Sequence, residues 1–139
     1  MESTLDPVAT LSDEDCWALL NANTLGRLAL SVGGEVDIFP VNFHADGKTI
    51  LFRTAPGTKL LEIAVHNSVA FEIDGHTPER AWSVVVKGIA KPLESQDDIT
   101  EADTSPLSPW VPTLKYRYVR IHPTMLSGRA FQRTEEPER

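Results

Sequence analysis

Two glycine-containing turns follow each other closely in the first half of the chain, and they restrict its fold more than any other feature. Gly33-Gly34 separates an alternating apolar run over residues 26–32 from a second run over 35–43, and Asp46-Gly47 leads from there into 48–54. Both dipeptides are typical of two-residue β-hairpins. Because parallel neighbours need a crossover of roughly a dozen residues, the sequence predicts antiparallel strands.

Later segments extend this pattern. Alternation or a high density of β-branched residues returns at residues 69–73, 82–90 and 115–122. Within 82–90, Gly88 indicates a bulge or a close approach of another backbone. Pro40, in the second hairpin strand, indicates an edge, a bulge or a strand that faces a ligand, because proline has no N–H for a central ladder.

Short helices are expected between some of the strands. Residues 13–22 carry an amphipathic pattern after the N-cap residue Ser12, a second helix begins after Gly57, and an acidic surface helix is expected within 95–103. Six or more strands in successive hairpins, with two or three short helices, predict a mainly β fold. We expect a small antiparallel β-barrel with short α-helices at its rim.

The chain is long enough for one domain. Its 139 residues are expected to comprise a loose lead-in over 1–10, one ordered domain over 11–131, and a charged, disordered tail over 132–139. The only cysteine, Cys16, cannot form an internal disulfide, and its position in the helical pattern favours a buried core thiol.

Charge and hydropathy exclude several classes of partner. The formal net charge is −7 and the isoelectric point is about 5.0, which argues against a surface built to attract nucleic acid. The N-terminus has neither a basic n-region nor an apolar h-region, and no apolar run approaches the length that spans a bilayer. We therefore expect a cytoplasmic protein without a membrane or nucleic-acid partner.

The segment Ile50–Glu62 has the parts of an anion site. A short apolar strand ends in a turn at Gly57-Thr58, with Arg53 and Lys59 on either side of it. Backbone N–H groups at a helix start, a hydroxyl and two cations together suit a phosphate. The alternative is an ordinary turn into a helix, with Thr58 as its N-cap and two solvated cations.

No other motif indicates a catalytic or metal site. No two histidines are spaced to place a metal pair on one helix face, and the chain has no nucleophile elbow, Walker loop or dinucleotide-binding glycine motif. If the protein is an enzyme, we expect a bound cofactor to supply the chemistry. No catalytic side chain and no metal ligand is therefore assigned.

Three segments in this order resemble a known family. They are GRLALSVGGEVDIFPVNFHADGKTILFRTAPGTKLLEI, VAFEID and AWSVVVKGIA. Together they look like the pyridoxamine 5′-phosphate oxidase-like family of FMN-binding split β-barrels, over residues 11–131. The resemblance implies a six-stranded antiparallel split β-barrel, FMN as cofactor, and a homodimer with the cofactor at the subunit interface.

The resemblance also implies three groups of cofactor-binding residues. The first group matches the family's phosphate-binding strand end and turn: Arg53, Thr54, Thr58 and Lys59. The second matches the strand whose backbone runs along the isoalloxazine: Pro40, Val41 and Asn42. The third matches the start of the strand that reaches the ring system: Trp82 and Ser83. A core aromatic remains the alternative for Trp82.

Two departures from the family's vitamin B6 oxidases bear on function. Those enzymes carry Ser-Arg-Lys at the phosphate turn and an Arg- and Trp-containing C-terminal segment, whereas this chain has Gly57-Thr58-Lys59 and ends in SGRAFQRTEEPER. The resemblance therefore implies an FMN-dependent oxidoreductase that passes hydride to or from a small-molecule substrate or electron donor, and not a pyridoxamine phosphate oxidase. A deazaflavin in place of FMN, or a nonenzymatic module that binds a flavin, deazaflavin or haem, remains the alternative.

Overall fold

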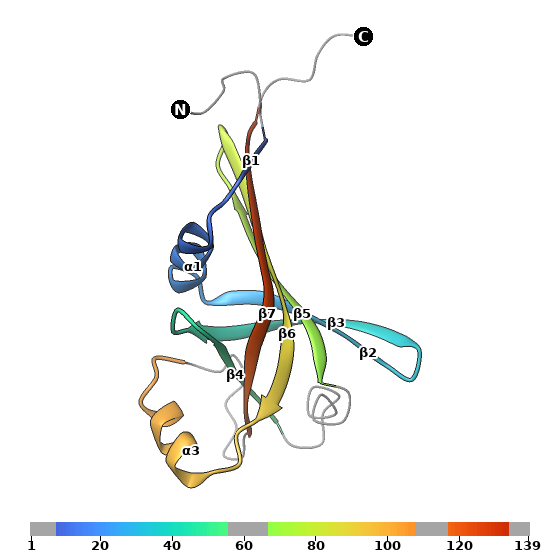
Figure 1. Cartoon of the computed structure of the whole chain (residues 1–139), viewed down its shortest axis with the longest axis vertical. Coiled ribbons are helices and arrows are strands. Elements are labelled where there is room, and N and C mark those ends of the chain that lie inside the picture. The colour runs from blue at the N-terminus through green and yellow to red at the C-terminus, as the bar shows by residue number, and fades with distance from the viewer. Residues whose placement is uncertain (1–7, 56–66, 108–116, 134–139) are drawn as a thin grey trace.

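A computed structural model describes residues 8–55, 67–107 and 117–133 (Figure 1). Within these ranges the chain is mainly β, with seven strands and two short helices. In chain order the elements are β1 (Val8–Thr10), α1 (Asp13–Asn21), β2 (Leu25–Val32), β3 (Glu35–Ala45), β4 (Ile50–Thr54), β5 (Ser68–His76), β6 (Arg80–Pro92), α3 (Gln96–Asp103) and β7 (Arg117–Gln132).

The strands form one antiparallel sheet that closes on itself. Their order is β1-β7-β4-β3-β2-β5-β6, and a further pairing joins β6 to β7. Six strands thus complete a ring, and β1 is attached to the outer end of β7. The predicted six-stranded antiparallel barrel is confirmed. In Figure 1, β6 and β7 run along the long axis while the β2–β3 hairpin projects sideways.

The predicted turns and helix starts are present where the described residues include them. Gly33, Gly34 and Gly47 have positive φ in the turns that precede β3 and β4. Ser12 caps α1 by accepting a hydrogen bond from the Asp15 N–H at 3.1 Å, and Ser95 caps α3 in the same way. The helix expected after Gly57 lies outside the described residues.

Both ends of the domain carry more strand than the sequence pattern indicated. Val8–Thr10, within the expected lead-in, pairs with Arg129–Phe131. The last strand was expected to end at His122, but β7 continues to Gln132, the first residue of the expected tail. It passes Pro123 because the β6–β7 register shifts between Lys87 and Gly88, so the proline falls at a bulge.

The main core lies between the inner face of the sheet and α1. Phe43 and Phe71 meet edge to face, with ring centroids 4.9 Å apart. Cys16 and Leu20 of α1 are fully buried against the sheet, so the core-thiol interpretation of Cys16 is confirmed. At Gly128 of β7, a Cβ atom would stand only 2.5 Å from the Cys16 Sγ, so this glycine lets α1 lie directly on the strand.

The turn between β3 and β4 generates a pH-dependent prediction. Burial raises the pKa of Asp46, but the backbone N–H groups of Thr49 and Lys48, the Thr49 hydroxyl and Arg120 outweigh it, so the pKa is lowered from 3.8. The N–H bonds measure 2.6 Å and 2.8 Å. A carboxylate with a lowered pKa in the folded state stabilises the protein above its unfolded pKa, and this contribution is lost as the pH falls through the folded value.

We therefore expect Asp46→Asn to lower the free energy of unfolding near neutral pH by about 1 kcal/mol, a modest value because the side chain is partly exposed. Urea denaturation of both proteins should show the difference shrinking once the pH falls well below 3.8. A difference that stays constant across this range would contradict the assignment.

Candidate functional site

The barrel opens where β3 and β4 part. These strands pair only over Phe43–Ala45 and Ile50–Phe52. If the register continued, Asn42 would stand opposite Arg53 and Val41 opposite Thr54. Pairing stops just before these residues, so the strand segments predicted to hold a cofactor border a gap in the sheet.

The backbone of β3 presents hydrogen-bonding groups to this gap. The Phe43 N–H donates to the Thr24 carbonyl at 2.9 Å, which places the Phe43 backbone groups on the β2 side. Because direction alternates along an antiparallel strand, the groups of Val41 also face β2, and those of Pro40 and Asn42 face the gap. The sequence predicted that Pro40 marks an edge, a bulge or a ligand-facing strand, and among the described strands this side of Pro40 is an unpaired edge. None of the described strands pairs with this side of β3 before Phe43.

The side chains of this group divide between core and surface. Val41 is 7% exposed and belongs to the main core, whereas Pro40 is exposed and Asn42 half-buried. Val41 therefore fixes the strand against the barrel, while its two neighbours are available at the edge. The prediction of a contact with a cofactor ring is not tested by this geometry.

Arg53 and Thr54 end β4 on the other side of the gap. Arg53 is half-buried, and its guanidinium carbon lies 5.9 Å from the centroid of the Tyr118 ring. The Tyr118 hydroxyl donates to an Asp103 carboxylate oxygen at 2.7 Å. This contact ties the acidic helix α3 to β7 beneath Arg53. Thr54 is 6% exposed, which favours a structural position for it, and Thr58 and Lys59 lie outside the described residues.

Trp82 and Ser83 lie near the far end of the barrel from Arg53. Both ends can be located along β7, where Arg53 pairs with Tyr118 and Trp82 pairs with Ala130. Along an extended strand these partners are separated by roughly 35 to 40 Å. The predicted phosphate-binding residues Arg53, Thr54, Thr58 and Lys59 are called the Arg53 group below. One chain therefore does not bring Trp82 and Ser83 together with Arg53 around a ligand the size of a flavin mononucleotide.

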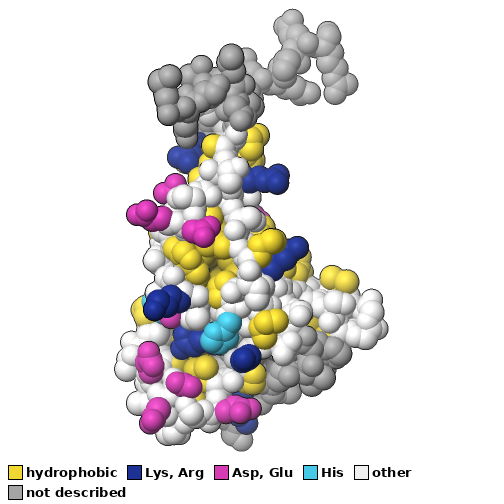
Figure 2. Space-filling view, in the orientation of Figure 1, with side chains coloured by type: hydrophobic (Ala, Val, Ile, Leu, Met, Phe, Trp, Pro, Cys, Tyr) yellow, Lys and Arg dark blue, Asp and Glu magenta, His cyan; other side chains and the backbone are white. Residues whose placement is uncertain are grey.

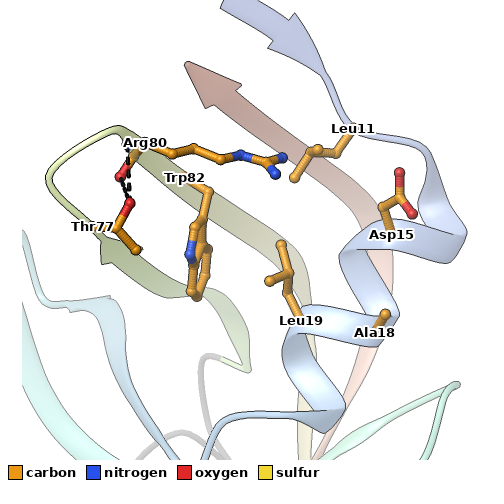
Figure 3. Close-up of a pocket in the computed structure, with 7 residues that line it drawn as sticks. All are labelled: Leu11, Asp15, Ala18, Leu19, Thr77, Arg80 and Trp82. Carbon is orange, nitrogen blue, oxygen red and sulfur yellow. Dashed lines mark hydrogen bonds between the residues drawn. The ribbon is translucent and has the colours of Figure 1, made fainter. Parts of the chain in front are cut away.

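Trp82 instead lines a cavity between α1 and the β5–β6 hairpin (Figure 3). Its ring packs against the main core, as the alternative interpretation of a core aromatic requires, but it remains partly exposed. The other lining residues are Leu11, Asp15, Ala18, Leu19, Thr77 and Arg80. Sequence reasoning missed this site because its walls come from segments far apart in the chain. The one local signal is Arg80, a cation two residues before Trp82 at the start of β6.

Charged groups are distributed unevenly over the surface. Figure 2 shows acidic side chains gathered over α1 and around α3. On the outer face of the sheet, the Arg27 Nη1 lies 2.8 Å from a Glu72 oxygen and 3.2 Å from an Asp74 oxygen. Burial raises the pKa of Glu72 and Asp74 adds to this shift, while Arg27 opposes it. The single Arg27 cation therefore offsets only part of the negative charge of the two carboxylates between β2 and β5.

In the residues that the structure describes, no group of three histidine, cysteine or acidic side chains is placed to hold a metal ion. Over the same residues, no helix has the length and apolar character needed to cross a membrane.

Comparison with known proteins assigns this architecture to a family. The family model described as pyridoxamine 5′-phosphate oxidase matches residues 12–130. A solved structure from Corynebacterium glutamicum is 41% identical, with a TM-score of 0.83, and the match covers 94% of this chain and 98% of that one. An FAD-binding protein from Mycobacterium smegmatis is 43% identical, with a TM-score of 0.82 and coverage of 91% and 100%.

A curated protein of Mycobacterium tuberculosis, described as uncharacterized, is 43% identical over 93 residues, which are 67% of this chain and 84% of that protein. The family match extends over almost the whole described barrel, including the gap between β3 and β4 and the strand that carries Trp82. The chain belongs to the pyridoxamine 5′-phosphate oxidase family.

Proposed function

We propose that this protein binds a flavin nucleotide in the gap between β3 and β4 and acts as a hydride-transferring oxidoreductase. The observation that carries this proposal is the end of β3–β4 pairing at Phe43 and Phe52. It leaves a strand edge and the cation Arg53 on the two sides of one opening, in a chain of a family whose relatives include an FAD-binding protein.

The residues around the gap suit the two ends of such a ligand. Arg53 supplies a guanidinium for a phosphate group, and it is to be joined by Thr58 and Lys59 from the following turn. The Pro40 carbonyl and the Asn42 backbone groups supply acceptors and a donor for the polar edge of a flat ring. The buried Val41 holds this edge in place. The flavin, when bound, would supply the hydride chemistry, so no acid or base side chain is required.

The form of the flavin is part of the proposal. The resemblance implied FMN, with a deazaflavin as the alternative, whereas the Mycobacterium smegmatis relative is described as binding FAD. Both FMN and FAD carry the isoalloxazine ring and a phosphate next to the ribityl chain. The Arg53 group therefore serves either one, and FAD needs additional room beyond the first phosphate.

We further propose that the cofactor site is completed in a homodimer. Trp82 and Ser83, assigned to the ring system, lie too far along the barrel to reach the Arg53 group of the same chain. A second copy can bring its own β6 to the gap. The face that carries Pro40 also exposes large apolar side chains on the β2–β3 hairpin, with Val36 74% and Ile38 66% exposed, as expected for a protein interface.

A small-molecule substrate or electron donor other than pyridoxamine 5′-phosphate is proposed, because the chain departs from the vitamin B6 oxidases at the phosphate turn and at its C-terminus. A nonenzymatic flavin-binding module is the second candidate. It is favoured by the relative named for FAD binding and not for an activity.

The visible spectrum of the purified protein tests the proposed function. We expect flavin absorption bands, and mass spectrometry of the released cofactor should identify FMN or FAD. Bleaching of the bands by NADH or NADPH supports the oxidoreductase, and stable bands support the binding module. A deazaflavin spectrum would correct the cofactor. A colourless protein that takes up none of the three would contradict both candidates.

Removing the phosphate-binding cations tests the location of the site. We expect Arg53→Ala combined with Lys59→Ala to weaken flavin nucleotide binding by several kcal/mol, since charge-assisted hydrogen bonds contribute about 1.5 to 3 kcal/mol each. Fluorescence titration measures the affinity. Lys48→Ala, which removes one exposed cation from the turn before β4, is the control. Equal affinities for the double variant and the control would place the phosphate elsewhere.

An added charge on the β2–β3 hairpin tests the dimer. We expect Ile38→Glu to produce a monomer in light scattering and to lose the flavin, because a carboxylate would be desolvated at the interface. Thr100→Glu adds the same charge to the exposed surface of α3 and should leave the dimer intact. A monomeric Ile38→Glu protein that retains full flavin affinity would show that one chain forms the site alone.

A further inference from the structure

We propose that the cavity between α1 and the β5–β6 hairpin is a second ligand site, which takes a small planar aromatic monocarboxylate. The cavity has a volume of about 540 Å³, within the range of small-molecule sites in proteins. It lies at the Ala130 end of β7, away from the Arg53 group. Trp82 also belongs to the flavin site proposed for the dimer, so this proposal rests on the proposed function. The Arg80→Gln variant described below separates the two, because its flavin absorption bands are expected to be unchanged while its affinity for the second ligand falls.

One wall is a fixed aromatic surface. The Trp82 indole lies across Gly75 of the neighbouring strand, where a Cβ atom would stand 2.5 Å from Cζ2 and 2.7 Å from Cε2 of the ring. No other residue type leaves room for the indole in this position. Across the cavity from the ring lies Leu19 of α1 (Figure 3). A planar ring inserted there would contact apolar surface on both faces, and the tryptophan would lose little freedom on binding it.

A cation stands at the rim of this apolar slot. The Arg80 backbone is held by Thr77, whose N–H donates to the Arg80 carbonyl at 2.7 Å and whose hydroxyl accepts from the Arg80 N–H at 3.1 Å. The guanidinium extends above Trp82 toward Leu11 (Figure 3). It forms no hydrogen bond or ion pair with any of the described residues. A planar guanidinium beside an aromatic slot matches the two oxygens of a carboxylate.

The opposite wall limits the charge of the ligand. Asp15 lines the cavity from α1, and Asp13 and Glu14 precede it in the same helical turn. These carboxylates make the electrostatic potential at this wall more negative, so each further negative charge on a ligand adds repulsion from this side. The cavity therefore favours a ligand with a single negative charge. Nucleotides and phosphate esters are disfavoured.

Nuclear magnetic resonance titration of the full-length protein with indole-3-acetate tests this site. We expect saturable shifts of the Trp82 indole N–H and the Leu19 methyl resonances, with indole and phenyl phosphate binding more weakly. Arg80→Gln should weaken indole-3-acetate binding by about ten- to a hundredfold, the loss expected for a charge-assisted contact. Lys91→Gln removes one exposed cation from the other end of β6 and should change nothing.

A second variant tests the role of the acidic wall. Asp15→Asn should strengthen indole-3-acetate binding a few-fold and should reduce the discrimination against phenyl phosphate. Both Arg80 and Asp15 are exposed side chains, so the variants are expected to fold. Absence of saturable shifts at Trp82 and Leu19 would overturn the proposal, as would equal effects of Arg80→Gln and Lys91→Gln. Weaker indole-3-acetate binding by Asp15→Asn would overturn the monoanion assignment.

Discussion

The pairing of β7 with β6 is the constraint on which the rest of the molecule depends. This ladder runs from Arg80 opposite Gln132 to Pro92 opposite Val119 and closes the sheet into a barrel. The other side of β7 holds β4 near one end and β1 near the other. One strand thus sets the distance between the two ends of the molecule. It thereby separates the gap beside Arg53 from the cavity beside Trp82.

The gap and the cavity arise from different departures from regular packing. At the gap, two strands stop pairing while each keeps its other neighbour, so β2 and β7 hold the edges of β3 and β4 apart. At the cavity, α1 is seated on β7 through the contact between Cys16 and Gly128. Ala18 and Leu19 of α1 then face the β5–β6 hairpin across the cavity and do not fill it. Both openings are therefore bounded by elements that buried side chains fix to the core, such as Val41 of β3 and Cys16 of α1.

The sequence predicts the hairpins, the capped helices and the bulge at Gly88, because each depends on residues that are neighbours along the chain. It does not predict β1, since Val8–Thr10 is too short to show a period and gains its stability from β7. The sequence also does not predict the second half of β7. A proline normally ends a strand, and Pro123 is accepted here only because the register with β6 shifts beside it. The resemblance to the family assigns both Arg53 and Trp82 to one cofactor site. Their distance within one chain is set by the strand pairing of the barrel and cannot be deduced from local spacing. The cavity beside Trp82 is missed for the same reason.

The proline at the open edge of β3 has a consequence beyond ligand binding. An unpaired strand edge can accept a strand from another molecule and so begin aggregation. Pro40 has no N–H to offer on the side that faces the gap, so an incoming strand would lose a hydrogen bond in the middle of the exposed segment. A proline at this open edge thus helps to protect an unliganded chain against uncontrolled polymerisation.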